Sequence, residues 1–188
     1  NEVGVVQPIP EIAKLINDFK SSVAVSHKSL AVSYPLFHTD AAQAFQYMRC
    51  DVEAMGVDLL TISAHKIYGP KGIGCLYARS SGSNLQPTTY NLQPILTGGG
   101  QEFGVRSGTE NVPAIVGFAK AISLVAMDRE DEAVRVAKLR DQVWVGIKKI
   151  FPKATMNGSY KNRLPNNLNV YIPGVSGEQL LVALDLEG

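Results

Sequence analysis

Residues 61–74 read TISAHKIYGPKGIG, where an apolar run ends in a histidine, a lysine and a cluster of glycines and proline. A lysine is normally solvated, so Lys66 at the end of a buried strand raises the question of what its amine binds. The glycines and proline that follow predict a sharp turn. Beyond the turn, GIGCLYAR at 72–79 has the pattern of another strand, in which alternation should bury Cys75.

Two strand-length apolar runs lie here, namely LFHTD at 36–40, before this stretch, and VDLLTISA at 57–64, which overlaps its beginning. The residues between them, 41–55, are predicted to be mostly helical. Strands that alternate with helices are typical of a mostly parallel sheet covered by helices on both faces. The sequence therefore predicts an α/β protein with a three-layer αβα arrangement.

The rest of the chain divides into helices, loops and a second region. A helix is expected at 10–20, with the face Ile12, Leu15, Ile16 and Phe19, and surface segments at 21–35 and 80–90. A long helix should run from 111 to 150 and bend near DREDE at 128–132, with the core stripe Val112, Ile115, Val116, Ala119 and Ile122. We expect residues 1–151 to be part of a large domain, and 152–188 to begin a smaller α+β domain.

Composition excludes several classes of function. Lys and Arg number 18 against 17 Asp and Glu, for a net charge of +1, so no basic surface for nucleic acid is expected. No apolar run is long enough to span a membrane and no leader is evident, which favours a cytoplasmic protein. Cys50 and Cys75 lack the spacing of a zinc site or a disulfide framework, so no metal site is predicted.

Two side chains of opposite charge follow neighbouring strands. Asp40 ends LFHTD and Lys66 follows VDLLTISAH, and ligands of such sheets bind beyond the carboxyl ends of the strands. The two residues could form a plain salt bridge at the rim of the sheet. Ser63 and His65, which could bind an anion, instead favour a ligand site. His38, beside Asp40, is expected to be a packed neighbour rather than a base.

An amine, a carboxylate and anion-binding hydroxyls together suit pyridoxal phosphate. The lysine condenses with the aldehyde of the cofactor, the carboxylate keeps the ring nitrogen protonated, and hydroxyls and backbone amides hold the phosphate. The glycine-rich GGGQEFGVRSGTEN at 98–111 adds a close backbone approach, Arg106 and the hydroxyls of Ser107 and Thr109. GPKGIG is not a nucleotide-binding loop, because its glycine spacing and closing residues differ.

Several separate motifs of the chain resemble those of a known family. NEVGVVQPI, FHTDAAQAF, VDLLTISAHKIYGPKGIGCLY, GGGQEFGVRSGTENVPAIVG and LPNNLNVYIPGVSGEQLLVALD stand in the order found in the cysteine desulfurases. These are class V aminotransferases among the fold type I pyridoxal phosphate enzymes. The resemblance implies removal of sulfur from L-cysteine, giving alanine and an enzyme persulfide for iron-sulfur cluster assembly or other sulfur transfer.

The resemblance also implies roles for single residues. Lys66 matches the cofactor-binding catalytic lysine, Asp40 the partner of the ring nitrogen, and Gln43 the donor to the phenolic oxygen. The other matches to cofactor-binding residues are Ser63 and His65 on the phosphate, Thr109 reaching the phosphate of the neighbouring subunit in a homodimer, and Asn1 near the ring and the substrate carboxylate. A protein that accepts or scaffolds the sulfur is the implied partner.

Some family features have no counterpart in these residues. The family's sulfur-accepting cysteine would follow the last residues, its cofactor-stacking histidine would precede the first, and its substrate-binding arginine is also missing. Neither Cys50 nor Cys75 matches the nucleophile, so the chain looks like a piece of a longer protein, inactive by itself. Segment 21–35, with His27, is longer than usual. A selenocysteine lyase, another class V relative, or a non-catalytic interaction module are the alternatives.

Overall fold

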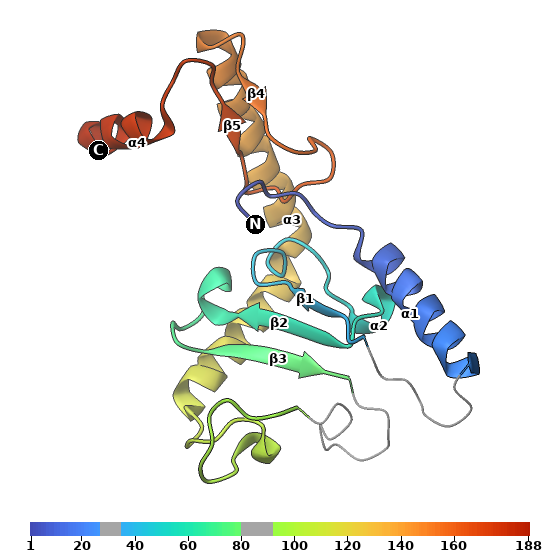
Figure 1. Cartoon of the computed structure of the whole chain (residues 1–188). Coiled ribbons are helices and arrows are strands. Elements are labelled where there is room, and N and C mark those ends of the chain that lie inside the picture. The colour runs from blue at the N-terminus through green and yellow to red at the C-terminus, as the bar shows by residue number, and fades with distance from the viewer. Residues whose placement is uncertain (27–34, 80–91) are drawn as a thin grey trace. The chain divides into compact units, whose positions relative to one another are not determined.

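The computed structural model describes residues 1–26, 35–79 and 92–188 of the chain (Figure 1). The predicted loop at 80–90, most of the segment 21–35 and His27 lie outside these residues. Within them the chain forms two compact units, one of Asn1–Gln7 with Glu130–Gly188 and the other of Pro8–Arg129. The domain boundary at 151 stays a prediction. None of the described helices is long and apolar enough to cross a bilayer.

The unit Pro8–Arg129 is built on a three-stranded sheet in the order β1 (His38–Asp40), β2 (Leu59–Ser63) and β3 (Gly74–Ala78) (Figure 1). β1 and β2 are parallel, as predicted, but β3 runs antiparallel to β2. The connection from Ser63 to Gly74 is too short for the helical crossover that a parallel strand needs, so the chain turns straight back. The described sheet is therefore mixed rather than mostly parallel.

Helices differ from the sequence prediction mainly in length. α1 (Ile9–Ser26) runs six residues beyond the predicted end at Lys20, into the segment expected to be irregular. Of the helix predicted at 41–55, only α2 (Val52–Met55) forms, and residues 42–47 form turns. The Asp51 carboxylate caps α2, and Gly56 ends it with a left-handed φ of 65°.

α3 (Val112–Ile150) has the predicted length, and its helical structure is uninterrupted through 128–132, where a bend was expected. Its first half packs on the sheet through Phe118 and Ala121, which join Leu60 and Ile62 of β2 in one buried cluster. The predicted stripe is wrong at Val112, Ile115, Val116 and Ala119, which are exposed, whereas its last member, Ile122, packs against this cluster. The core of this unit thus lies on one face of the sheet.

Polar side chains tie the sheet to the smaller helices. The Lys20 amine lies 2.8 Å from Asp58 Oδ2, which also accepts a hydrogen bond from the Phe37 amide at 2.8 Å. Both charged side chains are mostly buried, at 15% and 12% exposed. This contact joins α1 to the start of β2 and to the segment entering β1.

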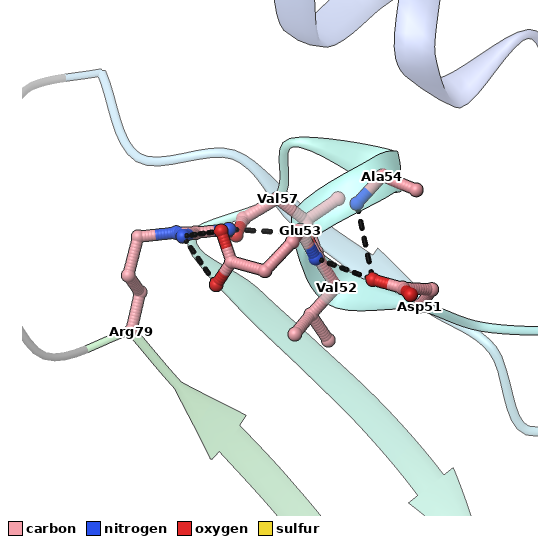
Figure 2. Close-up of polar contacts among 6 residues, drawn as sticks. All are labelled: Asp51, Val52, Glu53, Ala54, Val57 and Arg79. Carbon is pink, nitrogen blue, oxygen red and sulfur yellow. Dashed lines mark hydrogen bonds and ion pairs between the residues drawn. The ribbon is translucent and has the colours of Figure 1, made fainter.

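Arg79, directly after β3, holds α2 in place (Figure 2). Its guanidinium donates two hydrogen bonds to the Glu53 carboxylate at 2.8 and 2.7 Å. It also donates to the carbonyls of Val57 and Val52 at 3.1 and 3.0 Å. Nη1 makes both bonds to Glu53, while Nε and Nη2 bind the two carbonyls, so all three guanidinium nitrogens anchor α2 at the end of β3.

The second unit contains β4 (Thr155–Met156), antiparallel to β5 (Val170–Tyr171), and α4 (Gly177–Glu187). The first residues of the chain dock on the loop between these strands. The Val6 amide donates to the Asn162 carbonyl at 3.0 Å, and the Leu164 amide donates to the Gly4 carbonyl at 2.8 Å. The side-chain amides of Asn167 and Asn169 both donate to the Glu2 carbonyl at 3.0 Å.

Candidate active site

The carboxyl ends of β1 and β2 bring two predicted site residues to one edge of the sheet. Asp40 is paired in register with Thr61, and Ser63 follows two residues later, where β2 ends. Side chains alternate along a strand, so Asp40, Thr61 and Ser63 share the face opposite to Leu60 and Ile62. The apolar core therefore occupies one face of the sheet, and the polar candidates occupy the other.

Two imidazole and hydroxyl pairs lie on this polar face. Ser63 Oγ is 2.9 Å from Nδ1 of His65, and His38 Nε2 is 2.8 Å from Thr61 Oγ1. His38 and His65 are both exposed, so the expectation that His38 is packed is wrong. The Asp40 carboxylate accepts a hydrogen bond from the Ala42 amide at 2.8 Å. Both predicted phosphate ligands, Ser63 and His65, are thus in contact with each other.

Lys66 lies on η1 (Ala64–Ile67), a single 3-10 turn that continues directly from β2. Ala64 and Ile67 are buried in the core, which leaves His65 and Lys66 exposed. Tyr68 ends the turn with a left-handed φ of 62°, unusual for a residue other than glycine, asparagine or aspartate. The turn is thereby anchored at both ends, and it presents the amine outward.

The amine of Lys66 has no ion-pair partner among residues 1–26, 35–79 and 92–188, and it forms no salt bridge with Asp40. The alternative to a ligand site, a salt bridge between Asp40 and Lys66 at the rim of the sheet, is therefore not formed. Gln43 is half-buried in the turns that follow Asp40. Its amide is thus carried by the same strand end as the carboxylate.

The glycine-rich segment forms a compact turn before α3, around η3 (Glu102–Gly104). The Gly100 amide donates to Ser107 Oγ at 3.2 Å, and the Gly108 amide donates to Gln101 Oε1 at 2.9 Å. Thr109 follows this turn and is exposed. Ser107 is thus a structural residue here, whereas the Thr109 hydroxyl is accessible.

Asn1 is exposed and belongs to the other compact unit. Its carbonyl accepts the Gly4 amide at 3.0 Å, closing a tight turn. Its role beside a cofactor ring stays a prediction.

The two cysteines differ from expectation. Cys75 is exposed rather than buried. It pairs with Ile62, so it belongs to the face opposite to Ser63. Desolvation and the nearby Glu102 raise the pKa of the Cys75 thiol, and desolvation raises the pKa of Cys50 more than Arg129 lowers it. Neither thiol has the lowered pKa that marks a reactive nucleophile. In the described part of the chain, no three potential ligands gather to hold a metal ion.

Thr61 was not predicted as a site residue, and His38 was expected to be packed rather than exposed. The alternation Leu60, Thr61, Ile62, Ser63 was a usable signal, since it assigns Thr61 to the face of Ser63. The bond between His38 and Thr61 depends on strand register, which no single-sequence pattern gives.

Comparison with known proteins extends over the whole chain. It is 42% identical over 188 residues to cysteine desulfurase IscS 1 of Archaeoglobus fulgidus, covering 100% of this chain and 43% of that protein. It is 42% identical over 184 residues to the mitochondrial cysteine desulfurase of Eremothecium gossypii, covering 98% of this chain and 33% of that protein. This chain therefore spans less than half the length of these relatives.

Solved structures give the same picture. A NifS-like protein from Rickettsia africae superimposes with a TM-score of 0.78 at 34% identity, over 98% of this chain and 45% of that one. A structure described as SspA in complex with cysteine superimposes with a TM-score of 0.63 at 33% identity, over 100% of this chain and 44% of that one. The family profile for class V aminotransferases matches residues 1–188, so this chain belongs to the class V aminotransferases.

Proposed function

We propose that this chain is part of a pyridoxal phosphate-dependent cysteine desulfurase, which removes sulfur from L-cysteine and leaves alanine and an enzyme persulfide. The observation that carries the proposal is the Lys66 amine. It is exposed and without an ion-pair partner among the described residues, and it follows β2 at the same end of the sheet as Asp40. Similarity to cysteine desulfurases over the whole chain supports it.

The residues present suit the cofactor chemically. A phosphate needs accessible donors, and in the Ser63 and His65 pair the serine is half-buried and the histidine is exposed. A protonated ring nitrogen needs a carboxylate, and Asp40, whose Oδ1 accepts a hydrogen bond from a backbone amide, supplies one at this strand end. Lys66, Ser63, His65, Asp40 and Gln43 would hold the cofactor, joined by Thr109 across a homodimer and by Asn1.

When bound, pyridoxal phosphate supplies an aldehyde carbon that amines attack and a ring that accepts electrons. In this proposal Lys66 provides the amine and moves protons near the reacting carbon. The Asp40 carboxylate holds a proton on the ring nitrogen, which maintains the ring's ability to accept electrons. Ser63 and His65 would bind the anionic end of the cofactor.

The remaining assignments concern the whole protein. We propose that residues 1–151 belong to the three-layer large domain of the fold type I enzymes, and residues 152–188 to their small domain. L-cysteine as substrate is supported by the relatives' names and by the cysteine complex of SspA. The sulfur acceptor, the homodimer and a cytoplasmic location remain proposals, and one relative is named as mitochondrial.

The test is covalent capture of the cofactor. The protein is incubated with pyridoxal phosphate, its visible absorption is recorded, and borohydride then fixes the bound group for peptide mass mapping. We expect the visible band, and a phosphopyridoxyl group on Lys66. Lys66→Ala should lose both, whereas Lys71→Ala, a change at an exposed lysine in the next turn, should keep them. Labelling of surface lysines without preference for Lys66 would refute the proposal.

We expect these 188 residues alone to bind the cofactor but not to release alanine steadily from cysteine. The reason is that Cys75 belongs to the core-side face of the sheet, and the pKa values of both thiols are raised. Steady alanine release by this chain, lost in Lys66→Ala, would contradict this expectation. Comparing selenocysteine with cysteine as substrate of the whole protein would separate a desulfurase from a selenocysteine lyase.

A further inference from the structure

The hydrogen bond between His38 and Thr61 joins the two strands next to Asp40. His38 begins β1, and Thr61 is the register partner of Asp40 on β2. The bond from Nε2 to Oγ1, at 2.8 Å, therefore crosses the strand pair diagonally, on the face that also carries Asp40. Nothing in the roles assigned above uses this contact.

β1 is three residues long, so few ladder hydrogen bonds hold it. Where β1 ends, the Ala41 amide donates to the Thr61 carbonyl at 2.9 Å, and the Ala42 amide binds the Asp40 carboxylate. The orientation of Asp40 thus depends on how firmly this strand end stays on β2. Because so few hydrogen bonds join β1 to β2, one side-chain hydrogen bond between them is a large share of the total.

We propose that His38 and Thr61 form a brace that positions the Asp40 carboxylate, which makes them positioning residues of the cofactor site. Their action is indirect, since they hold the strand end that carries Asp40. This inference rests on the proposed function only for its effect on the cofactor. The brace itself concerns the strands, and it can be measured without any cofactor.

The chain offers matched variants. Thr61→Val removes the hydroxyl and keeps the shape, while Thr61→Ser keeps the hydroxyl. Thr39→Val makes the same change as Thr61→Val on the opposite face, because Thr39 pairs with Leu60. A net hydrogen bond is worth about 1 kcal/mol, and about 1.4 kcal/mol corresponds to a tenfold change.

The first measurement is hydrogen exchange of the Ala41 amide without cofactor. In Thr61→Val we expect exchange about fivefold faster, since opening of the strand end becomes easier. Thr61→Ser and Thr39→Val should leave it within about twofold of the parent. Unchanged Ala41 exchange in Thr61→Val would overturn the brace, whether or not the protein binds pyridoxal phosphate.

The second measurement is the absorption spectrum and dissociation constant of the Lys66-bound cofactor. We expect Thr61→Val and His38→Phe each to weaken cofactor binding about fivefold and to alter the visible band, with Thr61→Ser restoring both. In an Asp40→Asn background, Thr61→Val should have no further effect, because it acts through Asp40. Additive losses would overturn the positioning role. Failure of the parent protein to bind cofactor at Lys66 would instead refute the proposed function.

Discussion

Gly4→Ala should destabilise the unit formed by Asn1–Gln7 and Glu130–Gly188 by more than a backbone effect alone. Gly4 is buried and has a φ of +73°, a conformation that costs an alanine about 1–2 kcal/mol. A Cβ at this position would also lie 2.3 Å from Cγ of Asn167. The Asn167 side chain would have to move, and its hydrogen bond to the Glu2 carbonyl would be lost.

The magnitude follows from these separate effects. The lost hydrogen bond adds about 1 kcal/mol, and crowding in a packed site adds about 1 kcal/mol or more. We therefore expect a total loss of about 3–4 kcal/mol. Gly174→Ala is the matched control, because Gly174 has a φ of +79° with open space around its would-be Cβ. The control should lose only the backbone contribution of about 1–2 kcal/mol.

The assay is urea unfolding followed by the fluorescence of Trp144, the one tryptophan in the chain, which lies in the same unit. The free energy of unfolding is compared at unchanged slope of the urea dependence. Amide exchange at Val6 reports separately on detachment of the first seven residues, since this amide is bonded to Asn162. If Gly4→Ala and Gly174→Ala agree within about 0.5 kcal/mol, and Val6 exchange is also unchanged, the argument from crowding is refuted.

Three further predictions concern the unit Pro8–Arg129. Asp58→Ala should lower the free energy of unfolding in urea by about 3–5 kcal/mol, because it leaves the mostly buried Lys20 amine unpaired. Glu53→Ala, at a carboxylate 73% exposed, should lower it by about 1 kcal/mol or less, and equal losses in the two variants would contradict this. Ile67→Ala, at a side chain 2% exposed, should lower the free energy of unfolding by about 2–5 kcal/mol and weaken cofactor binding, because it leaves a cavity in the core. Ile67→Val should lower it by about 0.5–1.5 kcal/mol, and a similar loss in both variants would contradict this. Because the pKa of its thiol is raised, Cys75 should be alkylated by iodoacetamide only at a higher pH than in urea-unfolded protein, and alkylation at the same or a lower pH would contradict this. Its contribution to stability should be complete below the ordinary thiol pKa and lost as pH rises through the raised value.

The sequence predicted those parts of the molecule that depend on local order along the chain. β2 and the two ends of α3 were found because an apolar run and a long periodic segment end at glycine, proline or polar residues. Asp40 and Lys66 were assigned to one edge because parallel strands end together, and the register confirms that edge. These inferences needed no knowledge of which side chains touch.

What failed depended on packing between distant segments. α3 has apolar residues around much of its surface, so periodicity alone could not choose Phe118 and Ala121 over Val112 and Ile115. The direction of β3 was set by the length of a turn rather than by its own residues. Cys75 has the alternation of a buried residue, yet it is exposed.

The alternation along β2 has a consequence for how this strand tolerates change. Leu60 and Ile62 face the core, while Thr61 and Ser63 face the polar groups, so adjacent positions are constrained alternately by apolar packing and by hydrogen bonding. A scan of single substitutions along the strand should separate into two interleaved phenotypes, one in melting temperature and the other in ligand retention. Folding and chemistry can therefore be altered almost independently within five consecutive residues.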